Sequence, residues 1–580
     1  MISPRLLLIA LVLGLAPAVG SAQHHASGTV HLNQNATYPD APKVAVVVGA
    51  KGGEAAQVVS DLDGRLVWEG TVEEPADYHW SGESVGIVRF DDIQEVGMYR
   101  VHVEGLGTSE VIEVRPNAFE EATRLSLRAL YLQRASVALP VEFAGVWQRD
   151  AGHPDDQVII HPSAASEGRP AGSTISAPGG WYDAGDYNKY VVPAAVTSYY
   201  LFGALESFPS AVSELDLGIP ESANGAPDIV DEAVWNLRWM MRMQDPADGG
   251  LYHKLTHASF QGWLMPKDVT APRYVVQKTT NAALTYAAAL AQAARFLPAY
   301  PEYQSLADSC LAAARRAWAW AEANPAVTYD QNAMNAQHDP DISTGPYADG
   351  EYDDERAWAG VELALATGDA TFLDSIDFTR VFDAPVPYWE IDTGQLALRS
   401  LYEGTGPIAN TFREQALAGL RRLADHQLAL SDTSAYGMPI NERVDFIWGG
   451  TSVASARAGI LFDAAQQFDD RRYAEAGLDA LDYLLGRNPT GFSFVTGLGE
   501  KSPHNPHHRP TVADGVEPPV PGMLVGGPTH ANVTDCPAYP SEFPAARYVD
   551  AICSYSANEI TTYWNATFSY ATAGAEGVWR

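Results

Sequence analysis

The most informative stretch of this sequence is Gly179-Gly180-Trp181-Tyr182-Asp183-Ala184-Gly185-Asp186-Tyr187-Asn188-Lys189-Tyr190. It places two carboxylates, Asp183 and Asp186, on a turn rich in glycine and aromatic residues, directly before an apolar helical run. Enzymes that hydrolyse sugar chains use paired carboxylates, one to protonate the leaving oxygen and one to activate water or to attack. Taken alone, the pair also suits a solvated loop or a calcium loop, so its interpretation depends on the rest of the chain.

Helical apolar spacing dominates the chain on both sides of this turn, from residue 117 to 580. We predict helices at residues 118–137, 231–244, 281–297, 305–323, 354–367, 411–428, 452–468, 472–485 and 558–571. Many of them are alanine-rich, and loops rich in proline and glycine separate them. Such a long succession of antiparallel helix pairs fits an α/α toroid better than a four-helix bundle, which is smaller. The loops at one end of the toroid would then hold the active site.

The N-terminal part of the chain has a different pattern. Residues 27–115 contain short alternating or β-branched runs between Asp-Gly, Gly-Gly and Pro-containing turns, which predicts a small β-sandwich. Residues 1–22 have the charge, the apolar run and the small-residue cleavage site of a secretory signal. We therefore expect the protein to be secreted, either to the periplasm or outside the cell.

The composition narrows the range of partners. With 46% hydrophobic and 19% charged residues, the chain is that of a folded protein. Its formal net charge of -35 argues against nucleic acid and anionic membranes as partners, because binding to them needs clustered Lys and Arg. A neutral polysaccharide is compatible with this charge. We expect a monomer that contacts neither nucleic acid nor membrane.

The three cysteines of the chain are Cys310, Cys536 and Cys553. Cys310 lies in an alanine-rich helical run and is predicted to be a buried thiol. Cys536 and Cys553 bracket a short segment and suit a disulfide in an oxidising compartment, although the sequence leaves open whether they pair.

Two further clusters lie far downstream of the Asp183–Asp186 turn. In the first, His507, His508 and Arg509 stand in a proline-rich loop. Adjacent histidines rarely converge on one ion, so donation to sugar hydroxyls or to a catalytic carboxylate suits them better than zinc binding. In the second, Asn558 is a predicted helix N-cap, which would place Glu559 in the first helical turn at the mouth of the toroid. Taken alone, Glu559 suits a merely favourable interaction with the helix dipole better than a catalytic role.

Taken together, the clusters resemble glycoside hydrolase family 9, the inverting cellulase family. The matching segments are residues 181–189, 495–497, 507–509, 558–559 and 565–566, with a late-helix segment at 482–489. The beginning of the β-rich region, residues 31–34 and 41–46, is similar to the immunoglobulin-like module that precedes many of these catalytic domains.

The resemblance implies a mainly α fold, an (α/α)6 barrel at 117–580 preceded by an immunoglobulin-like β-sandwich at 27–115. It further implies hydrolysis of β-1,4-glucosidic bonds with inversion. Asp186 would be the general base, Asp183 would help to orient the attacking water, and Glu559 would be the general acid. This agrees with the chemistry, since an inverting pair stands roughly 6.5–9.5 Å apart to admit water.

The resemblance also suggests residues that contact the sugar. His507 and Arg509 would bind the ring next to the scissile bond. Aromatic residues on the rim would stack on sugar faces, and the candidates are Trp181, Trp448, Tyr555 and Trp564. Tyr182 is a further candidate for binding substrate. Packing in the core is the alternative for any single aromatic residue. Many relatives carry Tyr at the position of Trp564.

Two metal sites of the family bear on this chain. Many bacterial members bind zinc through Cys and His just before the Asp-Ala-Gly-Asp turn, but the segments around His153 and His161 hold no Cys, so we expect no zinc. Residues 344–355 resemble the calcium-binding loop of the family, with Asp354 and Glu355 as ligands. A solvated acidic helix start is the alternative. The hydrolytic chemistry itself requires no cofactor.

The expected function is that of a secreted endo-acting β-1,4-glucanase. The nearest alternative is an exo-acting relative: a cellodextrinase, a cellobiohydrolase or an exo-β-glucosaminidase. A non-catalytic carbohydrate-binding protein is a more remote alternative, since it would not need Asp183, Asp186 and Glu559 together.

Overall fold

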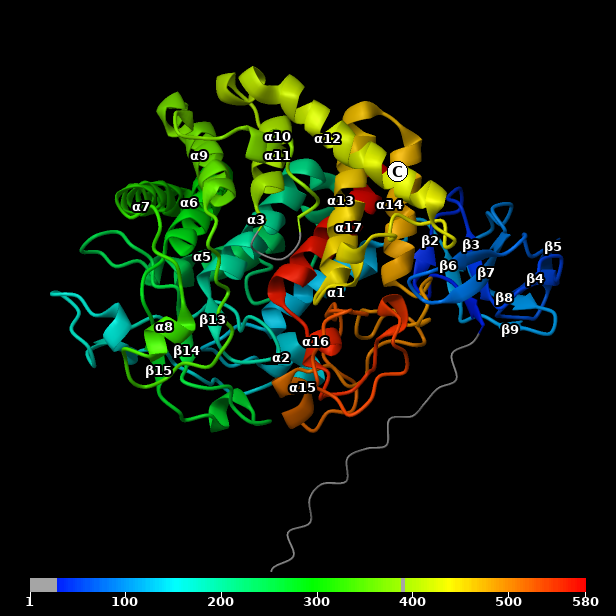
Figure 1. Ribbon diagram of the computed structural model, residues 1–580, viewed down its shortest axis with the longest axis horizontal. Helices are drawn as coiled ribbons and strands as arrows, with labels where there is room; N and C mark the ends of the chain where they lie inside the picture. Colours follow the sequence, from blue (N-terminus) through cyan, green and yellow to red (C-terminus); the bar gives the residue numbers. More distant parts are fainter. Residues whose placement is uncertain (1–28, 388–391, 580) are drawn as a thin grey trace, which may run out of the picture.

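The computed structural model describes residues 29–387 and 392–579 (Figure 1). The proposed signal segment at 1–22 lies outside these residues. The described chain begins with a β-sandwich, followed by a large helical barrel (Figure 1).

The sandwich consists of two sheets. One has the strand order β1-β3-β7-β6, and the other has the order β2-β10-β8-β4-β5 with β9 paired to β8. The strands are β1 (Val30–His31), β2 (Ala36–Thr37), β3 (Val44–Val48), β4 (Ala55–Ser60), β5 (Leu66–Thr71), β6 (Ala76–Tyr78), β7 (Glu83–Arg89), β8 (Gly97–Val103), β9 (Gly107–Thr108) and β10 (Ile112–Val114). In β8, the buried Tyr99, Val101 and Val103 alternate with more exposed residues, because successive side chains of a strand point to opposite faces.

The barrel has two concentric layers, and within the described residues each layer contains six helices. The inner helices are α3 (Val191–Ser207), α6 (Thr280–Phe296), α9 (Asp353–Thr367), α11 (Gly394–Glu403), α13 (Gly450–Phe468) and α17 (Thr562–Val578). The outer helices are α1 (Glu120–Leu132), α5 (Asp228–Arg242), α7 (Gln304–Ala323), α10 (Thr379–Phe382), α12 (Pro407–Thr433) and α14 (Arg471–Leu484). Inner and outer helices alternate along the chain, which is the (α/α)6 arrangement that the sequence led us to expect (Figure 1).

The side chains explain which helices lie inside. Nearly every residue of α3 is buried, as expected for a helix that is apolar all round. Small residues let the inner helices approach closely. Gly574 of α17, for example, lies against Phe462 of α13, and a Cβ atom there would stand 2.9 Å from that side chain. The predicted helices between residues 118 and 485 are confirmed, with ends that differ by a few residues. Helix α11 was not among the predicted helices.

Short elements gather at one end of the barrel. A sheet with the order β12-β11-β15-β14-β13 lies there. Its strands are β11 (Val158–Ile160), β12 (Thr174–Ile175), β13 (Lys189–Tyr190), β14 (Lys254–His257) and β15 (Arg273–Val275). The short helices are α2 (Val141–Ala144), α4 (Pro209–Val212), α8 (Gln331–Asn335), α15 (Arg509–Ala513) and α16 (Tyr555–Asn558). Except for α4, they lie near the same end as the sheet (Figure 1).

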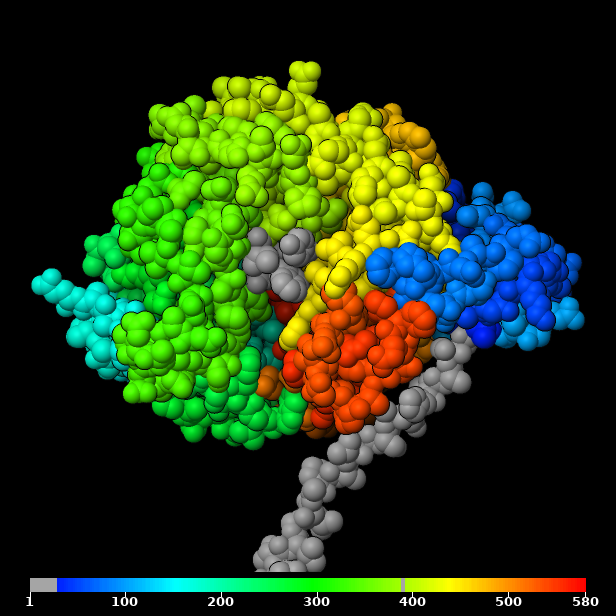
Figure 2. Space-filling view, viewed as in Figure 1, coloured from blue at the N-terminus to red at the C-terminus, as the bar shows by residue number. Residues whose placement is uncertain are grey.

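The sandwich is closely joined to the barrel. Tyr78 donates a hydrogen bond of 2.6 Å to the carbonyl of Ile440. The Gln34 amide donates to the carbonyl of Leu485 at 2.9 Å, and its side-chain oxygen accepts from the amide of Lys501 at 2.8 Å. Apolar side chains of β3 and β7 belong to the same buried cluster as the barrel core. Figure 2 shows the blue sandwich against the yellow and orange-red segments.

Within the described part of the chain, none of the helices combines the length and the apolar character needed to cross a bilayer.

Candidate active site

Three segments far apart in sequence meet at the end of the barrel that carries the short elements. Ala184 forms a backbone bridge with Thr561, and His507 forms one with Glu559. The amide of Arg509 donates to the carbonyl of Gly185 at 3.0 Å. Backbone hydrogen bonds therefore hold together the three clusters that the sequence singled out. Red C-terminal residues lie in the depth of a hollow near the middle of the face shown in Figure 2.

Gly185 explains why the turn needs glycine. A Cβ atom at this position would collide with the carbonyl oxygen of His507 and would stand 3.2 Å from a carboxylate oxygen of Glu559. Only a residue without a side chain lets the turn approach both neighbours this closely.

Asp186 is buried, and its two carboxylate oxygens differ. Oδ2 accepts hydrogen bonds from the side chains of Asn188 and Tyr190. Oδ1 is buried and has no hydrogen-bond partner among the described residues. Burial raises the pKa of this carboxyl, while the nearby charge of Arg509 acts in the opposite direction. One oxygen is thus held in place and the other remains available for a further contact.

Asp183 is fixed on the same turn. Its Oδ2 accepts a hydrogen bond of 2.5 Å from the hydroxyl of Tyr347, and its backbone carbonyl accepts from the amide of Thr562 at 2.8 Å. The turn is therefore tied both to the loop before α9 and to the first residue of α17.

Glu559 does not lie in a helix. The prediction that Asn558 is an N-cap is wrong: Asn558 is the last residue of α16, Glu559 is extended, and α17 begins at Thr562 with Thr561 as its N-cap. The Asn558 side chain instead bonds to loop groups, including the hydroxyl of Tyr548 at 2.6 Å. Burial, followed by the negative charge of Asp186, raises the pKa of Glu559 to about 8.

The cluster from His507 to Arg509 supports these carboxylates in different ways. The ring Nδ1 of His507 donates a hydrogen bond of 2.6 Å to the carbonyl of Ile552, and burial lowers the pKa of His507 to about 4. His508 is buried, and its Nε2 lies 3.1 Å from the side-chain oxygen of Gln133, so its role is structural. Arg509 donates to the carbonyls of Gly185 at 2.9 Å and Gln261 at 2.8 Å.

Three of the five aromatic residues predicted to bind substrate are buried in the core. Trp181 is only 3% exposed and donates to Glu232 at 2.6 Å, and Tyr182 is fully buried with its hydroxyl 2.8 Å from His153. Trp564 is buried on α17 against Gly449 and Gly526. The prediction that these residues bind substrate is wrong, since core packing covers them.

Trp448 and Tyr555 are half-buried and lie against each other. Their ring centroids lie 5.5 Å apart, and the ring of Tyr555 lies 5.8 Å from that of His507. These rings form a series that leads to the residue paired with Glu559.

Comparison with known proteins matches this geometry to a family. The family model described as glycosyl hydrolase family 9 matches residues 119–572, and the one described as cellulase N-terminal ig-like domain matches residues 25–108. The chain belongs to glycosyl hydrolase family 9. This family 9 hydrolase is 37% identical, over 93% of its length and 92% of the relative's, to the xyloglucan-specific endo-beta-1,4-glucanase BoGH9A of Bacteroides ovatus.

Two further relatives agree. Endoglucanase D of Acetivibrio thermocellus is 30% identical over 88% of the family 9 chain and 78% of its own length. A solved structure described as Bacteroides ovatus GH9 superposes with a TM-score of 0.88 at 35% identity, covering 95% of this chain and 99% of the other.

The family 9 chain contains functional candidates that sequence analysis missed. Tyr347 and Asn188 hold the two aspartates, and both lie within segments that had been singled out, although no role had been assigned to them. A loop with exposed aromatic residues, residues 259–265, contacts Arg509 and His507. Because Phe260 and Trp263 of this loop belong to no recognised motif, nothing in the sequence connected them with the site.

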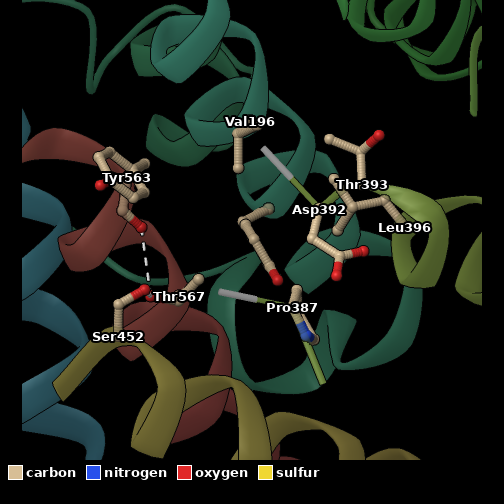
Figure 3. A pocket seen from close by; sticks show the side chains of 9 residues that line it. Val196, Pro387, Asp392, Thr393, Leu396, Ser452, Tyr563 and Thr567 are labelled. Carbon is tan, nitrogen blue, oxygen red and sulfur yellow. Dashed lines mark hydrogen bonds between the residues drawn. The ribbon is translucent and has the colours of Figure 1, made fainter. Parts of the chain in front are cut away.

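A cavity of this family 9 hydrolase lies among the inner helices α3, α11, α13 and α17. Figure 3 shows Val196, Asp392, Ser452, Tyr563 and Thr567 around it, with a hydrogen bond between Ser452 and Thr567. Its lining residues do not include the three predicted catalytic carboxylates. The geometry of the backbone bridges, rather than this cavity, locates the candidate active site.

The metal candidates of the family 9 chain differ in their surroundings. Among residues 29–387 and 392–579, no group of three or more His, Cys, Asp or Glu side chains is arranged to hold a metal ion. His153, near the position of the family's zinc site, bonds to Tyr182 and lies 3.3 Å from a ring nitrogen of His257. Both carboxylate oxygens of Glu355 are buried without a hydrogen-bond partner in the described part of the chain. An unpaired buried carboxylate fits a hard cation, so Glu355 is compatible with calcium.

Cys536 and Cys553 form a disulfide with a Cα–Cα distance of 5.3 Å, and Cys310 is a buried free thiol.

Proposed function

We propose that this family 9 hydrolase is an endo-β-1,4-glucanase that inverts the anomeric configuration. The observation that carries the proposal is the difference between two neighbouring carboxyl groups, the buried Asp186 and the partly buried Glu559. Asp186 has a free carboxylate oxygen, and the pKa of Glu559 is raised to about 8 by burial and by Asp186. A base and a protonated acid are what inverting hydrolysis needs at neutral pH.

In the proposed reaction, Oδ1 of Asp186 takes a proton from a water molecule. The oxygen of this water bonds to the anomeric carbon on the face opposite the leaving group. As the glycosidic C–O bond breaks, the leaving oxygen takes the proton of Glu559. Asp183, held by Tyr347, helps to orient the water. The products are two shorter chains, and exchange with solvent restores both protonation states.

His507 and Arg509 are proposed to bind the sugar next to the scissile bond, with Trp448 and Tyr555 stacking on neighbouring rings. The contact of His507 with Tyr555 supports this assignment. The named activities of the relatives support a β-1,4-linked glucan as the substrate class, and that of the Bacteroides ovatus relative supports a test of xyloglucan.

The test follows product lengths from carboxymethylcellulose, xyloglucan, cello-oligosaccharides and chitosan oligomers. We expect a rapid fall in viscosity and a mixture of early products from a polymeric β-1,4-glucan. A single short early product would contradict endo action and favour an exo-acting enzyme. Hydrolysis of the chitosan oligomers alone would favour a glucosaminidase.

We further propose that Glu355 and Asp354 bind calcium, which would stabilise the loop before α9 and take no part in the reaction. The unpaired Glu355 carboxylate supports this proposal. Export is proposed on the signal-like residues 1–22, and a disulfide is compatible with an oxidising compartment.

A further inference from the structure

Lys254 is a buried amine to which the proposed reaction assigns no role. It lies on β14 directly opposite Tyr190 of β13 (Figure 1), and its side chain is fully buried. Its Nζ donates hydrogen bonds to the side-chain oxygen of Gln331 at 2.8 Å, to the hydroxyl of Thr344 at 3.1 Å and to the carbonyl of Gly345 at 2.8 Å. Burying an amine is costly unless its N–H groups find acceptors, and these three acceptors match the three N–H groups of an ammonium. The surroundings therefore hold Lys254 in one position.

Two of the acceptors of Lys254 lie in the short segment that leads to Tyr347. The next residue of this segment, Pro346, accepts a hydrogen bond of 2.7 Å at its carbonyl from the ring Nε2 of His253. Tyr347 follows, and its hydroxyl donates a hydrogen bond of 2.5 Å to Oδ2 of Asp183. The adjacent residues His253 and Lys254 thus hold all three residues that directly precede the tyrosine bonded to Asp183.

The backbone of Tyr347 needs this support. Its φ angle is 43°, in the left-handed region that residues with a side chain rarely adopt. Such a conformation persists only where the surrounding contacts fix it, and the contacts of Lys254 and His253 immediately before Tyr347 are of this kind. Without the N–H donors of Lys254, we expect the segment to relax and the hydroxyl of Tyr347 to move away from Asp183.

Lys254 also contacts the tyrosine that holds the second aspartate. Its Nζ lies 5.7 Å from the ring centroid of Tyr190, whose hydroxyl donates to Oδ2 of Asp186 at 3.2 Å. The rings of Tyr190 and Tyr347 pack edge to face, with their centroids 4.5 Å apart. Burial lowers the pKa of Lys254 well below its usual value, while the negative charge of Asp186 acts in the opposite direction. The contacts of this one side chain therefore reach the supports of both aspartates.

We propose that Lys254 is a positioning residue for hydrolysis: by holding the segment before Tyr347, it keeps the hydroxyl of that tyrosine on Asp183 without touching the substrate. The inference rests on the proposed function for the reaction that Asp183 assists. Because Asp183 helps to orient the attacking water, its displacement slows the chemical step and leaves substrate binding intact. A small misplacement of a group that orients a reactant costs about 100-fold in rate.

The test measures kcat and KM of Lys254→Met on carboxymethylcellulose. Met keeps the length of the side chain but has no N–H donors, so we expect kcat to fall about 100-fold and KM to change less than about threefold. Lys43→Met is the matched control, because Lys43 is also buried and donates to the carbonyls of Pro39 and Ala41 at 2.9 and 2.8 Å, but lies in the N-terminal module. It should keep the wild-type kcat at temperatures where it is folded. A wild-type kcat in Lys254→Met, or a rise in KM alone, overturns the proposal.

A double-mutant cycle separates this role from a general loss of packing. Tyr347→Phe removes the hydroxyl that Lys254 is proposed to place, so adding Lys254→Met to Tyr347→Phe should lower kcat further by less than about threefold. Losses that multiply overturn the proposal, because Lys254 then acts independently of Tyr347. If Lys254→Met does not fold, Lys254→Gln, which keeps an N–H donor, takes its place in the cycle.

Crystal structures of the wild type and of Lys254→Met test the placement without relying on activity. A Tyr347 hydroxyl that has moved away from Asp183 in the variant supports the proposal, and one that still bonds to Asp183 overturns it. If the wild type hydrolyses no glucan, the proposed function fails, and this structural comparison still decides whether Lys254 positions Tyr347.

Discussion

The two ends of the inner barrel surround their carboxyl groups with different partners. At the end away from the active site, Arg295 pairs with Glu206 and Glu362 at 3.0 Å each, and Arg399 pairs with Glu206 at 3.2 Å. We call these four residues the arginine network. Burial raises the pKa of Glu206, but the two arginines outweigh it and hold that pKa below its usual range. Glu362 pairs with Arg295, and burial outweighs this arginine, so the pKa of Glu362 is raised.

At the other end, Glu559 has no such counter-charge. Burial and the charge of Asp186 raise its pKa to about 8, although Arg509 partly opposes the change. The degree of burial therefore does not decide the role of a carboxyl group. Its partners decide it: the arginine network stabilises the fold, whereas Asp186 and Glu559 keep capacity for a substrate and a water molecule.

The largest expected effect is that of Glu559→Gln. The amide resembles the protonated acid in shape but cannot give up a proton, so kcat should fall by about 10³–10⁴-fold while the melting temperature changes little. Initial rates on a polymeric β-1,4-glucan and calorimetric melting measure the two effects. Full activity in this variant would contradict the assignment of the general acid.

The arginine network should show the converse behaviour. Arg399→Met leaves Glu206 with less counter-charge in the core, so the free energy of unfolding should fall by about 3 kcal/mol, with kcat unchanged at temperatures where the variant is folded. Arg65→Met is the control, because Arg65 forms an exposed pair with Glu95 and should cost less than about 1 kcal/mol. A large loss of kcat in folded Arg399→Met would contradict the separation of the two ends.

Gly185→Ala tests whether the turn of Asp183 and Asp186 must pack closely against His507 and Glu559. The added methyl group collides with the His507 carbonyl and crowds Glu559, so kcat should fall about 100-fold. Gly168→Ala serves as the control, since a Cβ atom at Gly168 meets nothing within 4 Å. Equal activities of the two variants would show that the close contact is not needed.

The dependence of kcat/KM on pH tests the proposed roles of Glu559 and Asp186. Glu559 must carry its proton, so kcat/KM should decline as the pH rises through about 8. Asp186 must be ionised, and since burial raises its pKa, the decline at low pH should begin above the usual range of an aspartate. A pH profile that stays flat between about pH 7 and 10 would exclude Glu559 as the group that protonates the leaving oxygen.

The smallest expected effect concerns Glu355, a third buried carboxylate without a counter-charge. Removal of calcium with a chelator should lower the melting temperature by a few degrees, and added calcium should restore it. Glu355→Gln should abolish this response. If the wild type responds to neither chelator nor calcium, the proposed calcium site is wrong.

The sequence allowed prediction of those features that depend on local pattern. Helical periodicity located most barrel helices, and the spacing of Asp183 and Asp186 drew attention to the catalytic turn. The extended conformation at Glu559 was not predicted, because it depends on contacts with residues far away in sequence. Glu559 forms a backbone bridge with His507, and the next residue, Ile560, forms one with Val525. Local capping preference pointed to Asn558, but these tertiary contacts override it.

The roles of the aromatic residues could not be predicted for the same reason. Trp181 and Trp564 stand next to motif residues, yet the fold turns them into the core. Trp263 stands in no motif, yet the fold brings it to His507. Proximity in sequence to a catalytic residue therefore does not show whether an aromatic side chain is buried or exposed.

The junction between sandwich and barrel has a consequence for how this enzyme can be divided. Gln34 bonds at both ends of the segment between Leu485 and Lys501, which precedes the loop of His507 and Arg509. Two family models match the chain, but the two parts are not independent. The sandwich supports a segment that leads to the catalytic loop, and its apolar side chains belong to the same buried core as those of the barrel. The N-terminal module is thus a part of the enzyme's scaffold, and recombination that exchanged it would have to preserve this brace.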